Sequence, residues 1–115
     1  MEEVKGTFKR AGFALLRGQN WTYLLRNTHI IIGRQGSSAK WLVDLDLGNS
    51  HYIARQHALL AYNFRDEKFE IRCLSKKSRI KVDGKAYKFQ DPPATLKHRS
   101  VITVHKMSFL FLLPS

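Results

Sequence analysis

Short runs of alternating or β-branched residues, separated by glycine and polar turns, account for most of the chain. Residues 43–47 and 69–74 alternate apolar and polar side chains with a period of two, which predicts half-buried strands. Other runs are rich in isoleucine, valine, leucine and aromatic residues, which favour strands. Strands are predicted at residues 13–16, 21–25, 29–32, 43–47, 69–74, 80–82, 85–89, 101–104 and 107–113.

Turn residues and one alanine-rich segment refine this picture. Asp83-Gly84 lies between two predicted strands, and this dipeptide is typical of a tight β-hairpin. Residues 53–62 contain enough alanine to fit a helix by propensity, but their position between strands favours a strand from about Ala58. Many short strands at a spacing of roughly ten residues indicate an all-β sandwich or barrel.

Length and composition limit the chain to one globular domain. Its 115 residues are too few for two ordinary domains, and a hydrophobic content of 43% is enough for a single core. No apolar run reaches the roughly 18 residues of a membrane span, and the N-terminus lacks the apolar core of a secretory signal. A single cysteine, Cys73, excludes an internal disulfide and favours a reducing compartment. Residues 1–12 are predicted to be a flexible N-terminal extension of a domain that spans residues 13–115.

Charge is the strongest compositional signal. Twenty Lys and Arg against nine Asp and Glu give a formal net charge of +11, and no acidic residue lies between Val4 and Val43. This imbalance suggests a polyanionic partner, which would be nucleic acid, a phosphorylated protein or another acidic surface. The alternative is that the basic residues form a solvated face with no ligand.

Residues that could support catalysis or metal binding do not form a recognisable pattern. Five histidines are present, but no pair has the spacing of metal ligands, and no carboxylate is placed to complete a site. No serine or cysteine lies in a nucleophile motif, and Gly33 and Gly36 belong to neither a phosphate-binding loop nor a dinucleotide fingerprint. We therefore expect a protein that is not an enzyme and has no metal or cofactor.

Four short motifs follow one another between predicted strands. They are Gly33-Arg34, Ala54-Arg55-Gln56-His57, Ser75-Lys76-Lys77-Ser78 and Val82-Asp83-Gly84. In this order and spacing, over nearly the whole chain, the sequence resembles the forkhead-associated (FHA) domain, and most closely the FHA domains of forkhead-type transcription regulators. The resemblance implies a β-sandwich of about eleven strands whose loops at one end bind phosphothreonine peptides.

The resemblance also implies a role for each matching residue. The phosphopeptide would be bound by Arg34, Arg55, Ser75, Lys76, Lys77 and Arg79. The loops would be shaped by Gly33, His57 and Gly84. A phosphate dianion favours guanidinium groups and hydroxyl or amide donors on a preformed surface. We expect a monomeric interaction module of the nucleus, without membrane contact. Its expected partner is a phosphothreonine-containing nuclear protein, with non-specific contact to nucleic-acid phosphate as a second expectation.

Three positions depart from the family pattern. Ala54 replaces the motif serine, and Lys77-Ser78 replaces an Asn-Gly pair. A hydrogen bond to a charged group is worth about 1.5–3 kcal/mol, so the loss of two such bonds weakens binding by roughly two to four orders of magnitude. Two hypotheses follow. One is an interaction module with weakened phosphate specificity. The other is a degenerate FHA fold that has lost phosphopeptide binding and contacts protein or nucleic-acid phosphate through its basic surface.

Overall fold

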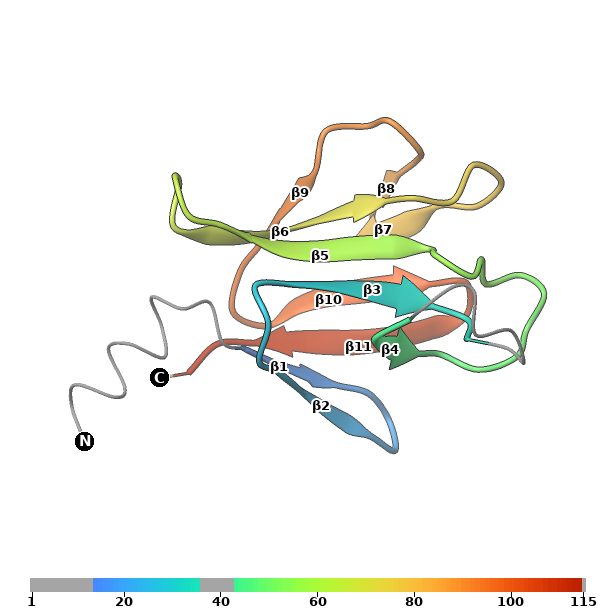
Figure 1. The fold of residues 1–115 in the computed structure, drawn as a ribbon, viewed down its shortest axis with the longest axis horizontal. Coiled ribbons are helices and arrows are strands. Elements are labelled where there is room, and N and C mark those ends of the chain that lie inside the picture. The colour runs from blue at the N-terminus through green and yellow to red at the C-terminus, as the bar shows by residue number, and fades with distance from the viewer. Residues whose placement is uncertain (1–13, 36–42, 115) are drawn as a thin grey trace.

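Eleven β-strands in two sheets make up the computed structural model, which describes residues 14–35 and 43–114 (Figure 1). The strands are β1 (Ala14–Arg17), β2 (Thr22–Leu25), β3 (His29–Gly33), β4 (Leu45–Asp46), β5 (Ala58–Asn63), β6 (Lys68–Cys73), β7 (Ile80–Val82), β8 (Lys85–Tyr87), β9 (Ala94–Leu96), β10 (Ser100–Val104) and β11 (Met107–Leu112). Within the described ranges there is no helix long and apolar enough to cross a membrane.

The two sheets pack face to face, which confirms the predicted all-β sandwich. One sheet has six strands in the order β2-β1-β11-β10-β7-β8, and the other has five in the order β4-β3-β5-β6-β9. β3 and β4 run parallel, whereas the other described pairs are antiparallel. Because β6 and β7 belong to different sheets, the loop between them crosses from one layer to the other.

Side chains that alternate along the strands form the core between the sheets. In β6, Phe69, Ile71 and Cys73 are buried, as the period of two predicts. The ring of Phe69 meets that of Phe111 from the other sheet edge to face, with centroids 5.0 Å apart and an interplanar angle of 64°. This contact joins the two layers through their inner faces.

The differences from the predicted strands lie mainly at short edge strands. β4 has only two residues, where the alternation predicted a strand over residues 43–47. Asp44 lies just before it, and its Oδ2 accepts a hydrogen bond from the Ile31 backbone N–H at 2.7 Å. β9 was not predicted, because its three residues come directly after Pro92-Pro93, which usually signal a break. β8 ends at Tyr87, two residues earlier than predicted.

Two predictions about the backbone are confirmed. β5 begins at Ala58, so the alanine-rich segment is a strand from that residue and not a helix. Asp83 and Gly84 join β7 to β8 with φ angles of 52° and 87°. Positive φ at both central residues is the geometry of a type I′ hairpin turn. The predicted extension over residues 1–12 lies outside the described residues.

Candidate functional site

Three loops lie at one end of the sandwich, the end where β3 stops (Figure 1). They are the residues that follow β3 (34–35), the β4–β5 loop (47–57) and the β6–β7 loop (74–79). The β5–β6 turn lies at the opposite end. We call the surface that these three loops form the apical surface.

Arg34 ties the end of β3 to the β4–β5 loop. Its backbone N–H donates to the Ala54 carbonyl at 3.0 Å, and its side-chain Nε donates to the Ile53 carbonyl at 3.0 Å. Gly33 makes this approach possible, because a Cβ at its position would lie 2.2 Å from the Arg55 carbonyl oxygen. Any other residue would push the two segments apart, so the glycine allows Arg34 to reach the loop.

His57 is fully buried beneath the loops and holds them through both ring nitrogens. Nδ1 accepts a hydrogen bond from the Ala54 backbone N–H at 3.0 Å, and Nε2 lies 3.1 Å from the Arg79 carbonyl oxygen. This pair of contacts requires a neutral ring with its proton on Nε2, which donates to Arg79. Burial lowers the pKa of His57 and favours this neutral form. The prediction that His57 is buried and bonded to loop backbone is confirmed.

Ser75 shapes the β6–β7 loop from the inside. It is buried, and its Oγ accepts hydrogen bonds from the backbone N–H groups of Lys77 at 3.3 Å and Ser78 at 3.0 Å. Below it, the Cys73 thiol lies 3.4 Å from the Ser78 carbonyl oxygen, and burial raises the pKa of this thiol. Because Ser75 is buried and its Oγ lies close to the backbone N–H groups of its own loop, this geometry does not favour the predicted contact between Ser75 and phosphate.

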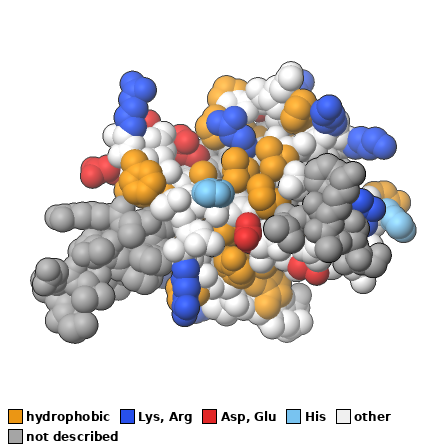
Figure 2. Space-filling view, in the orientation of Figure 1, with side chains coloured by type: hydrophobic (Ala, Val, Ile, Leu, Met, Phe, Trp, Pro, Cys, Tyr) orange, Lys and Arg blue, Asp and Glu red, His pale blue; other side chains and the backbone are white. Residues whose placement is uncertain are grey.

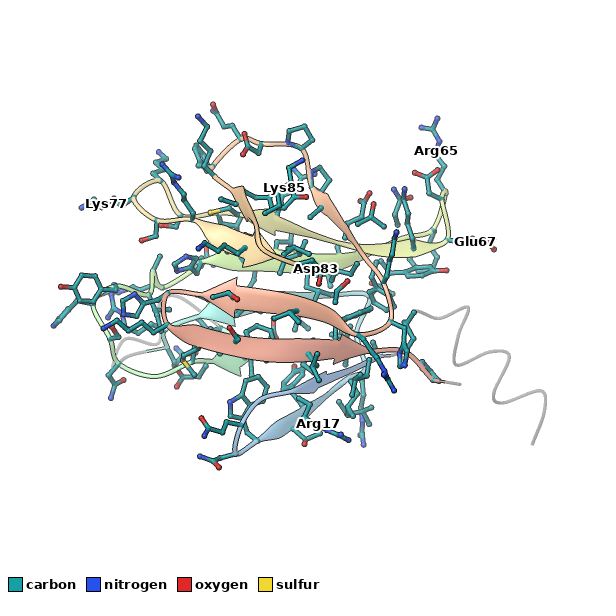
Figure 3. The ribbon with its side chains drawn as sticks, turned by 180° about the vertical axis from the view of Figure 1, so that it is seen from behind. Arg17, Arg65, Glu67, Lys77, Asp83 and Lys85 are labelled. Carbon is teal, nitrogen blue, oxygen red and sulfur yellow. The ribbon has the colours of Figure 1, made fainter. Side chains whose placement is uncertain are left out.

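The basic side chains predicted to bind phosphate lie in the three loops. Four are exposed: Arg55, Lys76, Lys77 and Arg79. Arg34 is partly exposed. The Lys76 Nζ lies 5.5 Å from the centre of the Phe89 ring, toward the segment between β8 and β9. Figure 3 shows Lys77 projecting from the β6–β7 loop, at the end of the sandwich opposite Arg65.

The apical loops carry positive charge without acidic residues of their own. Residues 47–57 and 74–79 contain no Asp or Glu. Asp46, at the end of β4, uses Oδ1 to accept hydrogen bonds from the backbone N–H groups of Gln35 and Gly48 at 3.3 and 3.0 Å. Lys and Arg side chains are otherwise spread over the visible face of the molecule (Figure 2). The apical surface can therefore attract a phosphate group.

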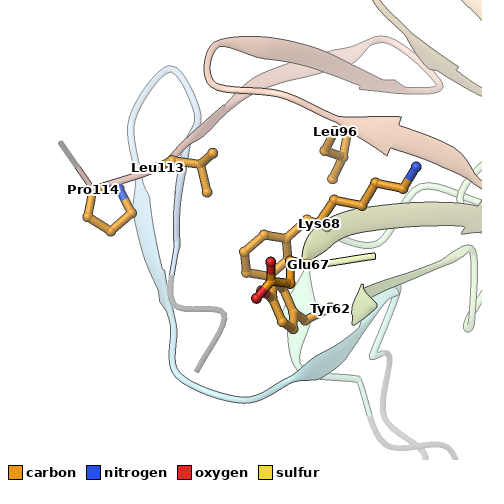
Figure 4. A pocket seen from close by; sticks show the side chains of 7 residues that line it. Tyr62, Glu67, Lys68, Leu96, Leu113 and Pro114 are labelled. Atoms are coloured by element: carbon orange, nitrogen blue, oxygen red, sulfur yellow. The ribbon is translucent and has the colours of Figure 1, made fainter. Parts of the chain in front are cut away.

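A hollow of about 280 Å³ lies at the opposite end of the sandwich (Figure 4). It is lined by Tyr62, Glu67, Lys68, Phe69, Leu96, Leu113 and Pro114, so most of its wall is apolar. None of the predicted site residues belongs to this lining. Among the described residues there is also no group of three or more His, Cys, Asp or Glu side chains that could hold a metal ion.

Sequence reasoning missed a depression of about 280 Å³ that two of the apical loops form together with strands β7 and β10 and the β10–β11 turn. It is lined by Tyr52, Ser78, Arg79, Lys81, Thr103 and His105. Of these residues, only Arg79 was a predicted site residue. The lining comes from three separate segments of the chain, so no local motif signals it.

The FHA domain family model matches residues 30–105, and the chain belongs to this family. FHA domains are protein-interaction modules and not enzymes.

Individual relatives agree with this assignment. The chain is 33% identical to the transcriptional activator FHA1 of Nicotiana tabacum, over 99% of the chain and 54% of the relative. It is 32% identical to the pre-rRNA-processing protein FHL1 of Saccharomyces cerevisiae, over 89% of the chain and 11% of the relative. The chain thus spans about half the length of the first relative and far less of the second.

A solved structure shows the same fold. The N-terminal FHA domain of S. cerevisiae Rad53p, in complex with a phosphothreonine peptide, superimposes with a TM-score of 0.71 at 14% identity. The match covers 89% of this chain and 94% of that one.

Proposed function

We propose that the chain binds phosphothreonine peptides through the apical surface, with Arg34 as the anchor for the phosphate. One observation carries this proposal. The Arg34 Nε is bound to the Ile53 carbonyl, and the terminal amino groups make no hydrogen bond within the described part of the chain. A guanidinium fixed in this way presents two N–H donors that match two phosphate oxygens. The solved FHA domain that carries a phosphothreonine peptide supports this class of ligand.

The other basic residues of the apical surface contribute mainly charge. Arg55 and Lys77 are exposed and lie in the two loops beside Arg34, so each can approach a bound phosphate. Lys76 can do so only by leaving Phe89. Long, exposed cations add attraction but little directional preference, because an ammonium group acts as a point charge.

Phosphate specificity is weakened by the side chains of Ala54 and Ser78 in the apical loops. The backbone of Ala54 is fixed by hydrogen bonds to Arg34 and His57, but its side chain is a methyl group that cannot donate to phosphate. The side-chain hydroxyl of Ser78 lies 3.4 Å from the Tyr52 carbonyl oxygen and is directed into the neighbouring loop. Binding therefore depends on Arg34 and on general charge more than on directed hydrogen bonds.

The proposed partner is a phosphothreonine-containing protein of the nucleus, and the proposed location of this chain is also the nucleus. The support is that relatives of this chain are a transcriptional activator and a pre-rRNA-processing protein. Because the chain covers only part of each relative, these partners and this location are proposals.

The test is fluorescence anisotropy with a phosphothreonine peptide library and the same library without phosphate. We expect weak binding with a preference for phosphate and little selection of flanking residues. Arg34→Ala should weaken phosphopeptide binding by about 10- to 150-fold, since it removes charge-assisted hydrogen bonds. Arg65→Ala, an exposed arginine at the opposite end, is the matched control and should change little.

A variant that restores the family's motif residues completes the test. Ala54→Ser with Lys77→Asn and Ser78→Gly should sharpen the preference for phosphothreonine over threonine. The proposal fails if the native chain already discriminates as well as this triple variant. If Arg34→Ala and Arg65→Ala behave alike, the second candidate function holds. The three departures from the family pattern favour that candidate, in which the fold has lost phosphopeptide binding and contacts partners through another basic surface.

A further inference from the structure

Each sheet of the sandwich has two border strands, whose outer sides pair with no other described strand. They are β2 and β8 in the six-stranded sheet, and β4 and β9 in the five-stranded sheet. Natural proteins protect such edges with short strands, charged residues or proline, because an open edge can pair with another extended chain. Three of the four edges follow this rule. β4 has two residues, β8 has three and begins with Lys85, and β9 has three and follows Pro92-Pro93.

β2 is the edge that lacks this protection. It has four residues, more than the other three border strands, and its sequence Thr22-Tyr23-Leu24-Leu25 contains no charged residue and no proline. Figure 1 shows β2 along the lower border of the sandwich. Threonine, tyrosine and leucine in an extended edge strand are well suited to pairing with a further strand.

The hydrogen bonds between β1 and β2 identify the backbone groups of β2 that remain open. At the closed end of this hairpin the Gly18 N–H donates to the Trp21 carbonyl at 2.9 Å. Bonded and non-bonded pairs alternate along an antiparallel pairing, so the N–H and C=O groups of Thr22 and Leu24 face away from β1. No hydrogen bond joins these groups to another described residue. An added strand would therefore find two donors and two acceptors on this edge.

The side chains beside this edge are apolar on the outer face of the sheet. Leu24 is 41% exposed there, in one row with Leu15 of β1 and Leu112 of β11. The row borders a hollow of about 350 Å³, which is lined by Ala14, Leu15, Leu24, His98, Leu112, Leu113 and Pro114. An apolar side chain on the outer face of an added strand would cover part of this surface.

The exposed charged groups around β2 are basic. Arg17 lies on β1 beside the start of β2, Arg26 directly follows β2, and both are exposed. Figure 3 shows Arg17 at this border of the sandwich. Residues 14–26 contain no Asp or Glu. Asp44 adds to the effect of burial in raising the pKa of Tyr23, but its Oδ2 already accepts a hydrogen bond from a backbone N–H of β3. The charge around this edge is thus complementary to acidic side chains.

We propose that β2 receives an added strand from a partner protein whose side chains on one face are, in order, acidic, apolar and acidic. Thr22 and Leu24 would bond to the backbone of this strand, as in other peptides that join an open sheet edge. Since side chains on one face recur every second residue, the apolar side chain would pack on Leu24 and the acidic ones would meet Arg17 and Arg26. A second copy of this chain fits poorly, because it carries the same net charge of +11. The site does not involve Arg34 and does not rest on phosphopeptide binding.

The experiment uses the whole chain and a capped peptide with the central sequence Glu-Thr-Leu-Thr-Glu, in which glutamate and leucine share one face. With about nine-tenths of the chain bound, hydrogen exchange of the Thr22 and Leu24 amides, measured by NMR, should slow by about tenfold. The Ala86 amide is the matched control, because the two-residue turn before β8 directs it to the open side of that strand. Its exchange should not change.

Methylation of the peptide backbone tests the pairing itself. Only every second N–H of an added strand faces β2, while the others face solvent. One peptide carries N-methyl groups on the leucine and the glutamates, and a second carries them on the threonines. One of the two should lose at least about tenfold in affinity and the other should bind nearly as well as the parent, because only one set of N–H groups donates to β2.

Substitutions in the chain test each contact. Thr22→Pro removes an N–H that β1 does not use and should weaken peptide binding by about 2- to 13-fold. Leu24→Thr should weaken it by about 3- to 8-fold, whereas Val101→Thr, at a 38% exposed residue of β10, should change little. Arg17→Gln should weaken it by about 1.5- to 5-fold, and Arg65→Gln should not. Thermal melting of each variant checks that it is folded.

Three outcomes overturn the proposal. The first is that the peptide slows exchange at Thr22 and Leu24 no more than at Ala86. The second is that the two methylated peptides bind equally well. The third is that the Thr22 and Leu24 amides are already protected in the chain alone, at a concentration where light scattering shows a dimer. That result would assign the edge to a second copy of the chain.

Discussion

Replacing His57 with alanine tests whether this residue holds the apical surface together. The imidazole connects the β4–β5 loop, through the Ala54 N–H, to the β6–β7 loop, through the Arg79 carbonyl. His57→Ala removes both hydrogen bonds and leaves a cavity where a fully buried ring stood. Both hydrogen bonds join the His57 ring to backbone atoms, so in the described structure His57 is the one side chain that makes them.

The expected loss of stability follows from these contacts. An unsatisfied buried donor or acceptor costs about 1–3 kcal/mol, and the lower half of that range applies here because both hydrogen bonds are only partly buried. Together with the cavity, the free energy of unfolding should fall by about 3–5 kcal/mol. For a domain of this size, at roughly 4 °C per kcal/mol, Tm should fall by roughly 12–20 °C.

Thermal and urea denaturation followed by circular dichroism measure this change. His51→Ala is the control, because His51 is an exposed histidine in the same loop, and its free energy of unfolding should change by less than about 0.5 kcal/mol. Below the Tm of His57→Ala, this variant should lose less phosphopeptide affinity than Arg34→Ala. A Tm loss no larger than that of His51→Ala would show that the structural role assigned to His57 is wrong.

Two further predictions concern the same loops. Gly33→Ala should lower the free energy of unfolding by about 1–3 kcal/mol and also weaken phosphopeptide binding, because the added Cβ would lie 2.2 Å from the Arg55 carbonyl oxygen. Urea denaturation measures the stability change, and an unchanged free energy of unfolding would contradict the prediction. Burial lowers the pKa of His57 below its ordinary value of 6.5, so as the pH falls below about 6.5 the unfolded chain takes up the proton first. The contribution of His57 to the free energy of unfolding should be complete above about pH 6.5 and should decrease as the pH falls from there toward the pKa of the folded state. In His57→Gln, the free energy of unfolding should depend less steeply on pH over this range. An equally steep dependence in the two proteins would refute the buried, neutral state assigned to His57.

The strands and the hairpin could be predicted because they depend on neighbouring residues. Alternation in residues 69–74 identifies β6, since a strand with one face in the core repeats every two residues. Asp83-Gly84 identifies the turn, because these residues tolerate the positive φ angles that it needs. β9 escaped prediction because Pro92-Pro93 directly before it signals a break, whereas its pairing with β6 is a tertiary contact that the local sequence does not record. The parallel pairing of β4 with β3 is likewise a property of the sheet.

The sequence alone determined the basic charge, the strand pattern and the order of the motifs, and hence the family. The tertiary structure decided what each site residue contacts. Ser75 turns inward because the N–H groups of its own loop are within reach of its hydroxyl. The Arg34 guanidinium is fixed because the Ile53 carbonyl lies beside it. Tyr52 and His105 stack although they are far apart in the sequence, because the sandwich brings the β4–β5 loop to the β10–β11 turn. Contacts of this kind depend on the packing of the two sheets, which no local pattern of residues records.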